Sequence, residues 1–171
     1  MAQNDKFQTF NGYPDILGTR FVDWDEIKGG CGKDIVWTDS VGVCLAVTLY
    51  YPLGKVGVLA HIMGSAGSPV KLLPENVIDT LLKELLLDQH PVCFPLLEAS
   101  LAGEGLLSSH HEKKAPIVRA SLMKLGIPII GEDVCKAPGR FVFLDCATGT
   151  VSVYRAGRLT RKDLYFSNLS F

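Results

Sequence analysis

Two closely spaced stretches of the chain, residues 41–50 and 55–63, consist largely of apolar residues with many β-branched and aromatic side chains. Such runs are typical of buried strands. The four residues between them, Tyr51-Pro52-Leu53-Gly54, have the composition of a turn, because proline and glycine favour the backbone angles that turns require. The pattern therefore predicts a β-hairpin over residues 41–63.

Apolar residues recur at helical spacing in two later stretches. Residues 74–88 begin with Pro74 at a first helical position. Residues 115–125 have Pro116 near their start and are followed by Gly126, which favour a helix start and a helix end respectively. Both stretches are predicted to be helices. Four further runs have strand character: residues 96–102, 127–134, 140–145 and 150–155.

Strands outnumber helices in this pattern, and several of the strands are joined as hairpins. The predicted class is therefore α+β, a layered sandwich of packed mixed β-sheets flanked by helices. Residues 1–34 are polar and interrupted by glycines, which predicts an irregular N-terminal arm with room for one short strand. We expect one domain over residues 35–155 and a polar C-terminal tail over residues 156–171.

The composition supports a compact domain without a strong electrostatic preference for a partner. A chain of 171 residues with 47% hydrophobic content can bury a sizeable core without metal or disulfide cross-links. Seventeen Lys and Arg against eighteen Asp and Glu give a net charge of −1, so we expect neither nucleic-acid binding nor membrane insertion. The polar first eleven residues contain no signal-peptide pattern, which favours a cytoplasmic location.

The cysteines and histidines do not form a recognisable metal or disulfide pattern. The five cysteines are odd in number and scattered, with no Cys-x-x-Cys pair. Free thiols are expected, and a free cysteine is usually a small buried apolar residue. His110-His111-Glu112 falls in a charged stretch where a solvated loop is a better interpretation than a metal site. We therefore expect no metal and no other cofactor.

One cysteine and one histidine have a relation that suggests chemistry. If residues 51–54 form a four-residue hairpin loop, Cys44 lies directly opposite His61, and opposed Cβ atoms are about 5 Å apart. An imidazole at that distance can take the thiol proton and give a thiolate–imidazolium pair, which is an activated nucleophile. Thr38 is placed to accept a hydrogen bond from the second imidazole nitrogen, with Asp39 as the alternative acceptor.

The same pair also has a purely structural interpretation. A cysteine and a histidine that face each other across a hairpin can simply pack in the core, and a register slip of one residue would place them on opposite faces of the sheet. The spacing alone leaves both interpretations open.

A family resemblance covers these residues and most of the predicted domain. The run TDSVGVCLAVTLYYP at residues 38–52 and the run GVLAHIM at residues 57–63 resemble the signature of the chemoreceptor glutamine deamidase family, CheD. In that family a threonine precedes the nucleophilic cysteine by six positions and the general-base histidine follows it by seventeen, as do Thr38 and His61 around Cys44 here. Later segments resemble the family's closing region: residues 125–134, 139–140 and 148–153.

Membership would imply two packed sheets with helices outside and a cysteine-dependent amidohydrolase. Cys44 would be the nucleophile that attacks a glutamine carboxamide, His61 its base and Thr38 the residue that orients the imidazole. The substrate would be a protein that carries a target glutamine, such as a chemoreceptor, and a chemotaxis regulatory protein is a further possible partner. No cofactor would be required.

The sequence departs from the family pattern at several positions. Val43 replaces the serine that usually precedes the cysteine, and Gly64-Ser65 replaces a Leu-Pro pair after the histidine strand. Two alternatives therefore stay open. The chain could be a catalytically weak adaptor that binds a signalling partner through the cleft around Cys44, or a toxin-like deamidase that acts on another protein.

Overall fold

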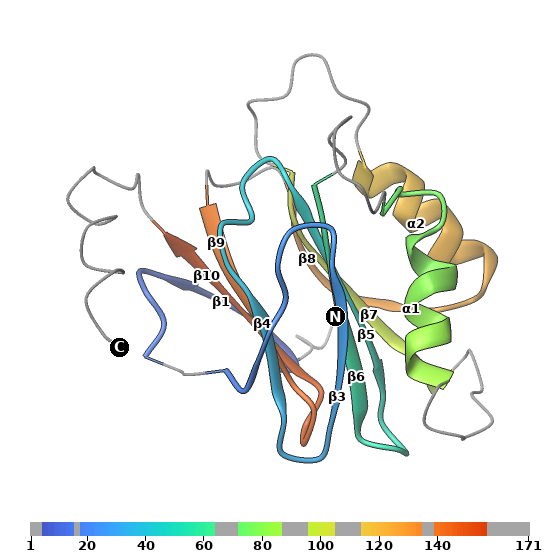
Figure 1. Ribbon diagram of the computed structural model, residues 1–171, viewed down its shortest axis with the longest axis horizontal. Helices are drawn as coiled ribbons and strands as arrows, with labels where there is room; N and C mark the ends of the chain where they lie inside the picture. The colour runs from blue at the N-terminus through green and yellow to red at the C-terminus, as the bar shows by residue number, and fades with distance from the viewer. Residues whose placement is uncertain are drawn as a thin grey trace.

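The structure is a computed structural model, and it describes residues 5–15, 18–63, 72–86, 96–104, 114–134 and 139–156. Ten strands in this part of the chain form two five-stranded sheets (Figure 1). The first, sheet A, has the order β1-β10-β9-β4-β2. Its strands are β1 (Phe7–Asn11), β2 (Arg20–Phe21), β4 (Ile35–Thr38), β9 (Gly139–Asp145) and β10 (Thr150–Ala156).

Sheet B has the order β3-β6-β5-β7-β8. Its strands are β3 (Ile27–Cys31), β5 (Leu45–Tyr51), β6 (Val56–Ile62), β7 (Glu98–Gly103) and β8 (Ile129–Val134). Each sheet contains one or more parallel pairs among antiparallel ones, so both sheets are mixed.

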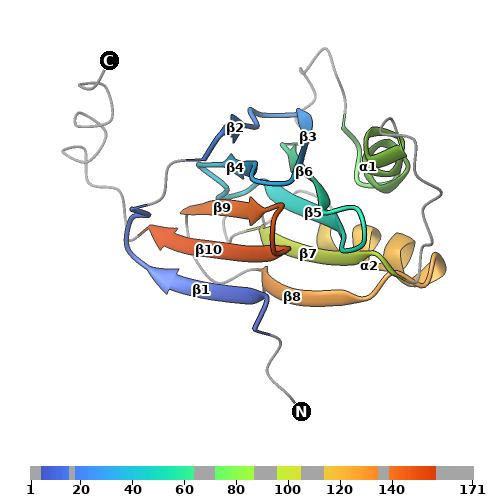
Figure 2. The same ribbon diagram turned by 90° about the horizontal axis from the view of Figure 1, so that it is seen from below.

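The molecule has three layers, seen edge-on in Figure 2. Sheets A and B pack face to face, and the helices α1 (Val77–Leu86) and α2 (Lys114–Lys124) cover the other face of sheet B. The predicted α+β sandwich is thereby confirmed, with both described helices on one side. Neither of these helices has the length and apolar content that crossing a bilayer requires.

Strand β5 separates two hydrophobic clusters because its side chains alternate between its two faces. Leu45, Val47 and Leu49 pack in the cluster between sheet B and the helices. Ala46 and Tyr50 belong instead to the cluster between the two sheets. A strand with apolar contacts on both faces has no polar alternation, which explains the continuous apolar run in the sequence.

The hairpin β5–β6 is present, but its predicted register is wrong by two residues. Tyr51 pairs with Val56, and His61 pairs with Ala46 rather than with Cys44. The loop runs over residues 52–55, where the Lys55 N–H bonds the Pro52 carbonyl and Lys55 has φ +49°. Because the shift is even, every side chain keeps the face that the sequence predicted.

The segment before residue 35 is not the irregular arm that the sequence predicted. It contributes three strands, of which β1 pairs in parallel with β10 and β3 pairs with β6. Gly30 lies in β3, where a Cβ atom would come within 2.7 Å of the Val36 side chain in the opposite sheet. Glycine is therefore required here by close packing, although it suggested a loop. The domain boundaries at residues 34 and 155 stay predictions, and residues 157–171 lie outside the described part.

Candidate active site

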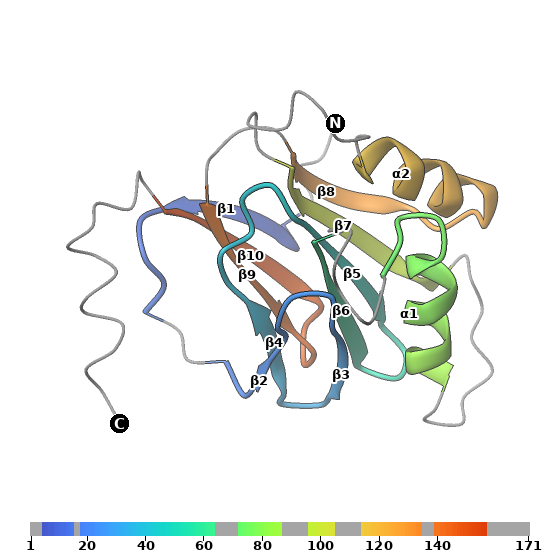
Figure 3. The same cartoon turned by 45° about the horizontal axis from the view of Figure 1, so that its top comes forward.

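Cys44 lies in the bend that leads into β5, at the end of the segment that crosses from sheet A to sheet B (Figure 3). Its side chain is only 4% exposed and belongs to the cluster between the sheets. Its carbonyl oxygen accepts a hydrogen bond of 2.7 Å from the Glu104 N–H, just beyond β7. Gly103 has φ +124°, and a Cβ atom there would overlap the Cys44 carbonyl. The backbone of Cys44 is therefore held tightly against the end of β7.

His61 lies on β6 with its side chain fully buried between the sheets. Its Nδ1 is 2.7 Å from Oγ1 of Thr38, which ends β4 in the opposite sheet. Thr38 belongs to a strand that sheet A pairs with β9. The hydrogen bond between Thr38 and His61 thus joins the two sheets.

The Thr38 hydroxyl determines which imidazole nitrogen carries the proton. Its single hydrogen is donated to the Val22 carbonyl oxygen at 2.7 Å, so Oγ1 can only accept from His61 Nδ1–H. The neutral ring therefore has its proton on Nδ1 and a lone pair on Nε2. Thr38 is fully buried, so water does not compete for the hydroxyl.

Nε2 of His61 is buried and has no hydrogen-bond partner in the part of the chain that the structure describes, the Cys44 thiol included. Cys44 directly precedes Leu45, which lies opposite Ile62 at the start of β5, so Cys44 is not opposed to His61 across the hairpin. A buried acceptor without a donor is uncommon in folded proteins, and a catalytic role is one of the reasons for which such a group is retained.

Burial shifts both groups toward their neutral forms. It raises the pKa of the Cys44 thiol, an effect that the positive charge of Lys114 opposes and the negative charge of Asp25 adds to. It lowers the pKa of His61 to about 4, against the opposing influence of Asp23 and Asp25. At neutral pH the structure therefore favours a neutral thiol and a neutral imidazole over the preformed thiolate–imidazolium pair that the sequence suggested.

Two other candidates from the sequence are not part of this arrangement. Asp39, the alternative partner of the imidazole, does not bond it, because Nδ1 is taken by Thr38 and Nε2 has no described partner. The His110-His111-Glu112 segment lies outside the described residues.

The end of β6 is held by a turn that sequence reasoning missed. The Asp25 N–H donates to the His61 carbonyl at 2.8 Å, and the His61 N–H donates to the Glu26 carbonyl at 3.1 Å. The Asp25 carboxylate also accepts from the Met63 N–H at 2.9 Å. These bonds fix the backbone of His61 on both sides, so the ring has a defined position relative to Thr38.

A buried ion-pair cluster supports the segment before Cys44, and it too was missed. Asp133 is fully buried and bonds Nε of Arg140 at 3.0 Å and Nη2 of Arg155 at 2.7 Å. Arg140, also fully buried, donates from Nη1 to the Val41 carbonyl at 3.4 Å and accepts from the Val41 N–H through its own carbonyl. The cluster therefore anchors the chain three residues before the candidate nucleophile.

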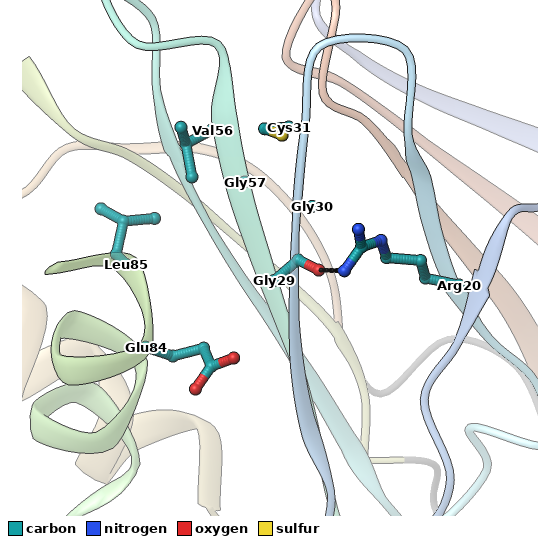
Figure 4. A pocket seen from close by; sticks show the side chains of 8 residues that line it. All are labelled: Arg20, Gly29, Gly30, Cys31, Val56, Gly57, Glu84 and Leu85. Carbon is teal, nitrogen blue, oxygen red and sulfur yellow. Dashed lines mark hydrogen bonds between the residues drawn. The ribbon is translucent and has the colours of Figure 1, made fainter. Parts of the chain in front are cut away.

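The described part of the chain also forms a cavity away from Cys44 (Figure 4). It has a volume of about 180 Å³ and lies between β3, β6 and α1. Its lining residues are Arg20, Gly29, Gly30, Cys31, Val56, Gly57, Glu84 and Leu85. Gly57 pairs with Tyr50, at the other end of β5 from Cys44, so this cavity is not part of the candidate active site.

Sequence comparison finds relatives that are named probable chemoreceptor glutamine deamidase CheD. The protein of Pyrococcus horikoshii is 31% identical over 137 residues, covering 71% of this chain and 83% of the relative. That of Desulfitobacterium hafniense is 30% identical over 143 residues, covering 75% and 88%. That of Thermococcus kodakarensis is 29% identical over 149 residues, covering 74% and 90%. No family model matches the chain.

Proposed function

Because this chain belongs to the family of chemoreceptor glutamine deamidases, CheD, we propose that it hydrolyses the side-chain amide of a protein-bound glutamine to glutamate and ammonia. In this proposal Cys44 is the nucleophile, His61 the general base and acid, and Thr38 the residue that orients the imidazole. The enzyme requires no cofactor, since thiol and imidazole supply the nucleophile and the proton transfers.

The observation that carries the proposal is the state of His61. The Thr38 hydroxyl holds the imidazole proton on Nδ1, and Nε2 has no hydrogen-bond partner among the described residues, so Nε2 is the nitrogen that can act as a base. The Cys44 thiol lies in the cluster between the two sheets, into which the His61 ring also projects from β6, next to its pairing partner Ala46. Buried side-chain nitrogens that serve only packing are usually hydrogen-bonded.

The reaction then proceeds in two halves. Nε2 of His61 takes the proton of the Cys44 thiol while Sγ bonds the carboxamide carbon of the glutamine, giving a tetrahedral oxyanion. When the oxyanion collapses, the C–N bond breaks, and the proton on Nε2 passes to the leaving nitrogen as ammonia departs. A thioester remains on Cys44. His61 next removes a proton from water, the hydroxyl oxygen bonds the thioester carbon, and the C–S bond breaks to release glutamate and restore the thiol.

Since thiol and imidazole are neutral at rest, proton transfer accompanies attack rather than preceding it. The sulfur has to come within hydrogen-bonding reach of Nε2, and rotation about the single χ1 torsion of Cys44 moves it without moving the strand. The backbone N–H groups of Val43 and Cys44 donate to no acceptor in the described part of the chain. They are the donors best placed to bind the oxyanion, at about 3 to 4 kcal/mol each in comparable acyl transfers.

The names of the relatives indicate the substrate. They are named as probable deamidases of chemoreceptor glutamines, and we infer that this chain acts on glutamines in the cytoplasmic part of a receptor and is itself cytoplasmic. Conversion of glutamine to glutamate adds a negative charge to the target, which is a chemically simple way to modify a signalling protein. A chemotaxis regulatory protein is a second partner consistent with this role.

Peptide mass spectrometry of a purified chemoreceptor cytoplasmic fragment tests the proposal. Incubation with the wild-type protein is expected to convert specific glutamines to glutamate and to release an equal amount of ammonia. Cys44→Ala should abolish both, whereas Cys31→Ala, which removes an exposed thiol, should retain them. Conversion at the wild-type rate by Cys44→Ala would rule out the proposed nucleophile.

A further inference from the structure

We propose that Lys114 is a positioning residue for the same reaction: it fixes the peptide that precedes Cys44 and places a positive charge beside the thiolate as it forms. This inference rests on the proposed function and adds a residue to it. Lys114 is the first residue of α2, an element that contributes none of Cys44, His61 or Thr38.

The position of Lys114 is unusual for a lysine. The side chain is only 8% exposed, although lysine is seldom buried without a partner. It also begins a helix, where the helix dipole is positive and disfavours a cation. Burial and a place at the start of a helix are both unfavourable for a lysine, which suggests that the positive charge of Lys114 has a function there.

Glu104 links the start of α2 to the nucleophile. Its carboxylate accepts hydrogen bonds from the backbone N–H groups of Lys114 and Ala115, which caps the helix. Its own N–H donates to the Cys44 carbonyl at 2.7 Å. Glu104 is 4% exposed and has φ +54°, a conformation that most residues avoid. A single buried residue therefore holds the first residue of α2 in a fixed place relative to Cys44.

The ammonium group of Lys114 reaches the peptide next to the nucleophile. Nζ lies 3.3 Å from the Val43 carbonyl oxygen, one residue before Cys44. The Val43 side chain itself is 45% exposed, so the residue contributes its carbonyl rather than its side chain to this contact. The ammonium group of Lys114 has three hydrogens, and the Val43 carbonyl is its one acceptor among the described residues. The other two N–H groups are available to interact with the Cys44 sulfur.

Three ionisable groups, each from a different part of the fold, bear charges or lone pairs that affect the ionisation of the Cys44 thiol. Lys114 on α2 is positive, Asp25 on the turn before β3 is negative, and His61 on β6 is neutral at rest. Burial disfavours the thiolate, and Lys114 is the group that opposes this effect. Without Lys114, burial and the negative charge of Asp25 would both raise the pKa of the Cys44 thiol, with no opposing effect from Lys114.

Alkylation of Cys44 by iodoacetamide across pH, read by peptide mass spectrometry, tests the role of Lys114. Lys114→Gln is expected to raise the pH midpoint of alkylation by about one unit, which is roughly a tenfold lower rate below the midpoint. Lys114→Arg keeps the charge and should restore most of the wild-type profile. A glutamine amide can still donate to the Val43 carbonyl, so a purely structural role predicts no shift in Lys114→Gln.

Thermal melting of each variant shows whether it is folded, and Lys114→Met provides a second neutral substitution if Lys114→Gln melts early. An unchanged midpoint in a folded neutral variant would overturn the role of Lys114, whatever the activity. Because alkylation requires no substrate, a shifted midpoint in a protein that deamidates nothing would instead refute the proposed function and leave the charge effect established.

Discussion

Acidification from about pH 7.5 to about pH 5 is expected to destabilise the folded protein through His61. The folded protein holds this imidazole neutral, with a pKa lowered from 6.5 to about 4 by burial. Between these two values the unfolded chain binds a proton that the folded protein does not. The free energy of unfolding therefore falls as pH drops through 6.5, and the loss levels off below about pH 4.

The size of the effect follows from the two pKa values. With 6.5 for the unfolded chain and about 4 for the folded protein, the loss at about pH 5 is about 2 kcal/mol, and its limit at lower pH is about 3 kcal/mol. A change of 2 kcal/mol is well resolved by urea unfolding of a domain of this size.

Urea unfolding of the wild type and of His61→Gln at both pH values isolates this contribution. Glutamine does not ionise, and its side-chain amide can donate to Thr38 as the Nδ1–H does. Other groups titrate equally in both proteins, so the wild type should lose about 2 kcal/mol more than the variant between the two pH values. Equal losses in the two proteins would refute the buried neutral state of His61.

Three further substitutions test the supports of the site. Thr38→Val leaves His61 Nδ1 and a backbone carbonyl unpaired in the core, so urea unfolding should show a loss of about 2 to 4 kcal/mol and deamidation should fall; full activity would exclude the orienting role. Gly103→Ala places a methyl group on the Cys44 carbonyl at a positive φ, so deamidation should fall at least about tenfold in protein that still melts cooperatively, and an unaffected rate would argue against a fixed backbone there. Asp133→Asn removes the counter-charge of buried arginine and should cost about 3 to 5 kcal/mol in urea unfolding; a loss below 1 kcal/mol would show that the ion pair is dispensable.

The hairpin residues show what the sequence can and cannot predict. The faces of Cys44 and His61 were predicted correctly because side-chain alternation survives an even shift of register. The pairing of the two strands was not predicted correctly. The turn falls at residues 52–55 rather than at residues 51–54, and either segment contains the same proline and glycine that indicate a turn. The hydrogen bond between Thr38 and His61 is present, while the catalytic roles of the three residues stay predictions.

Features that depend on contacts between distant segments could not be predicted. The short strand β4, which ends at Thr38, is recognisable only from its pairing with β9. Asp133 and Arg140 are charged residues in largely apolar strands of different sheets, so their ion pair can be recognised only once the packing of the two sheets is known. Lys114 follows a stretch with no clear pattern, and its backbone N–H is bonded by the carboxylate of Glu104, ten residues earlier.

Trapping of the acyl-enzyme tests most directly whether Cys44 attacks a glutamine carboxamide. A receptor fragment is incubated with the protein in the presence of hydroxylamine, which attacks a thioester and converts the acyl group to a hydroxamate. The mechanism predicts that the target glutamines acquire hydroxamate at the expense of glutamate, and that neither product forms with Cys44→Ala or without enzyme. Glutamate formation with no hydroxamate at any hydroxylamine concentration, and equally in Cys44→Ala, would contradict a covalent intermediate on Cys44.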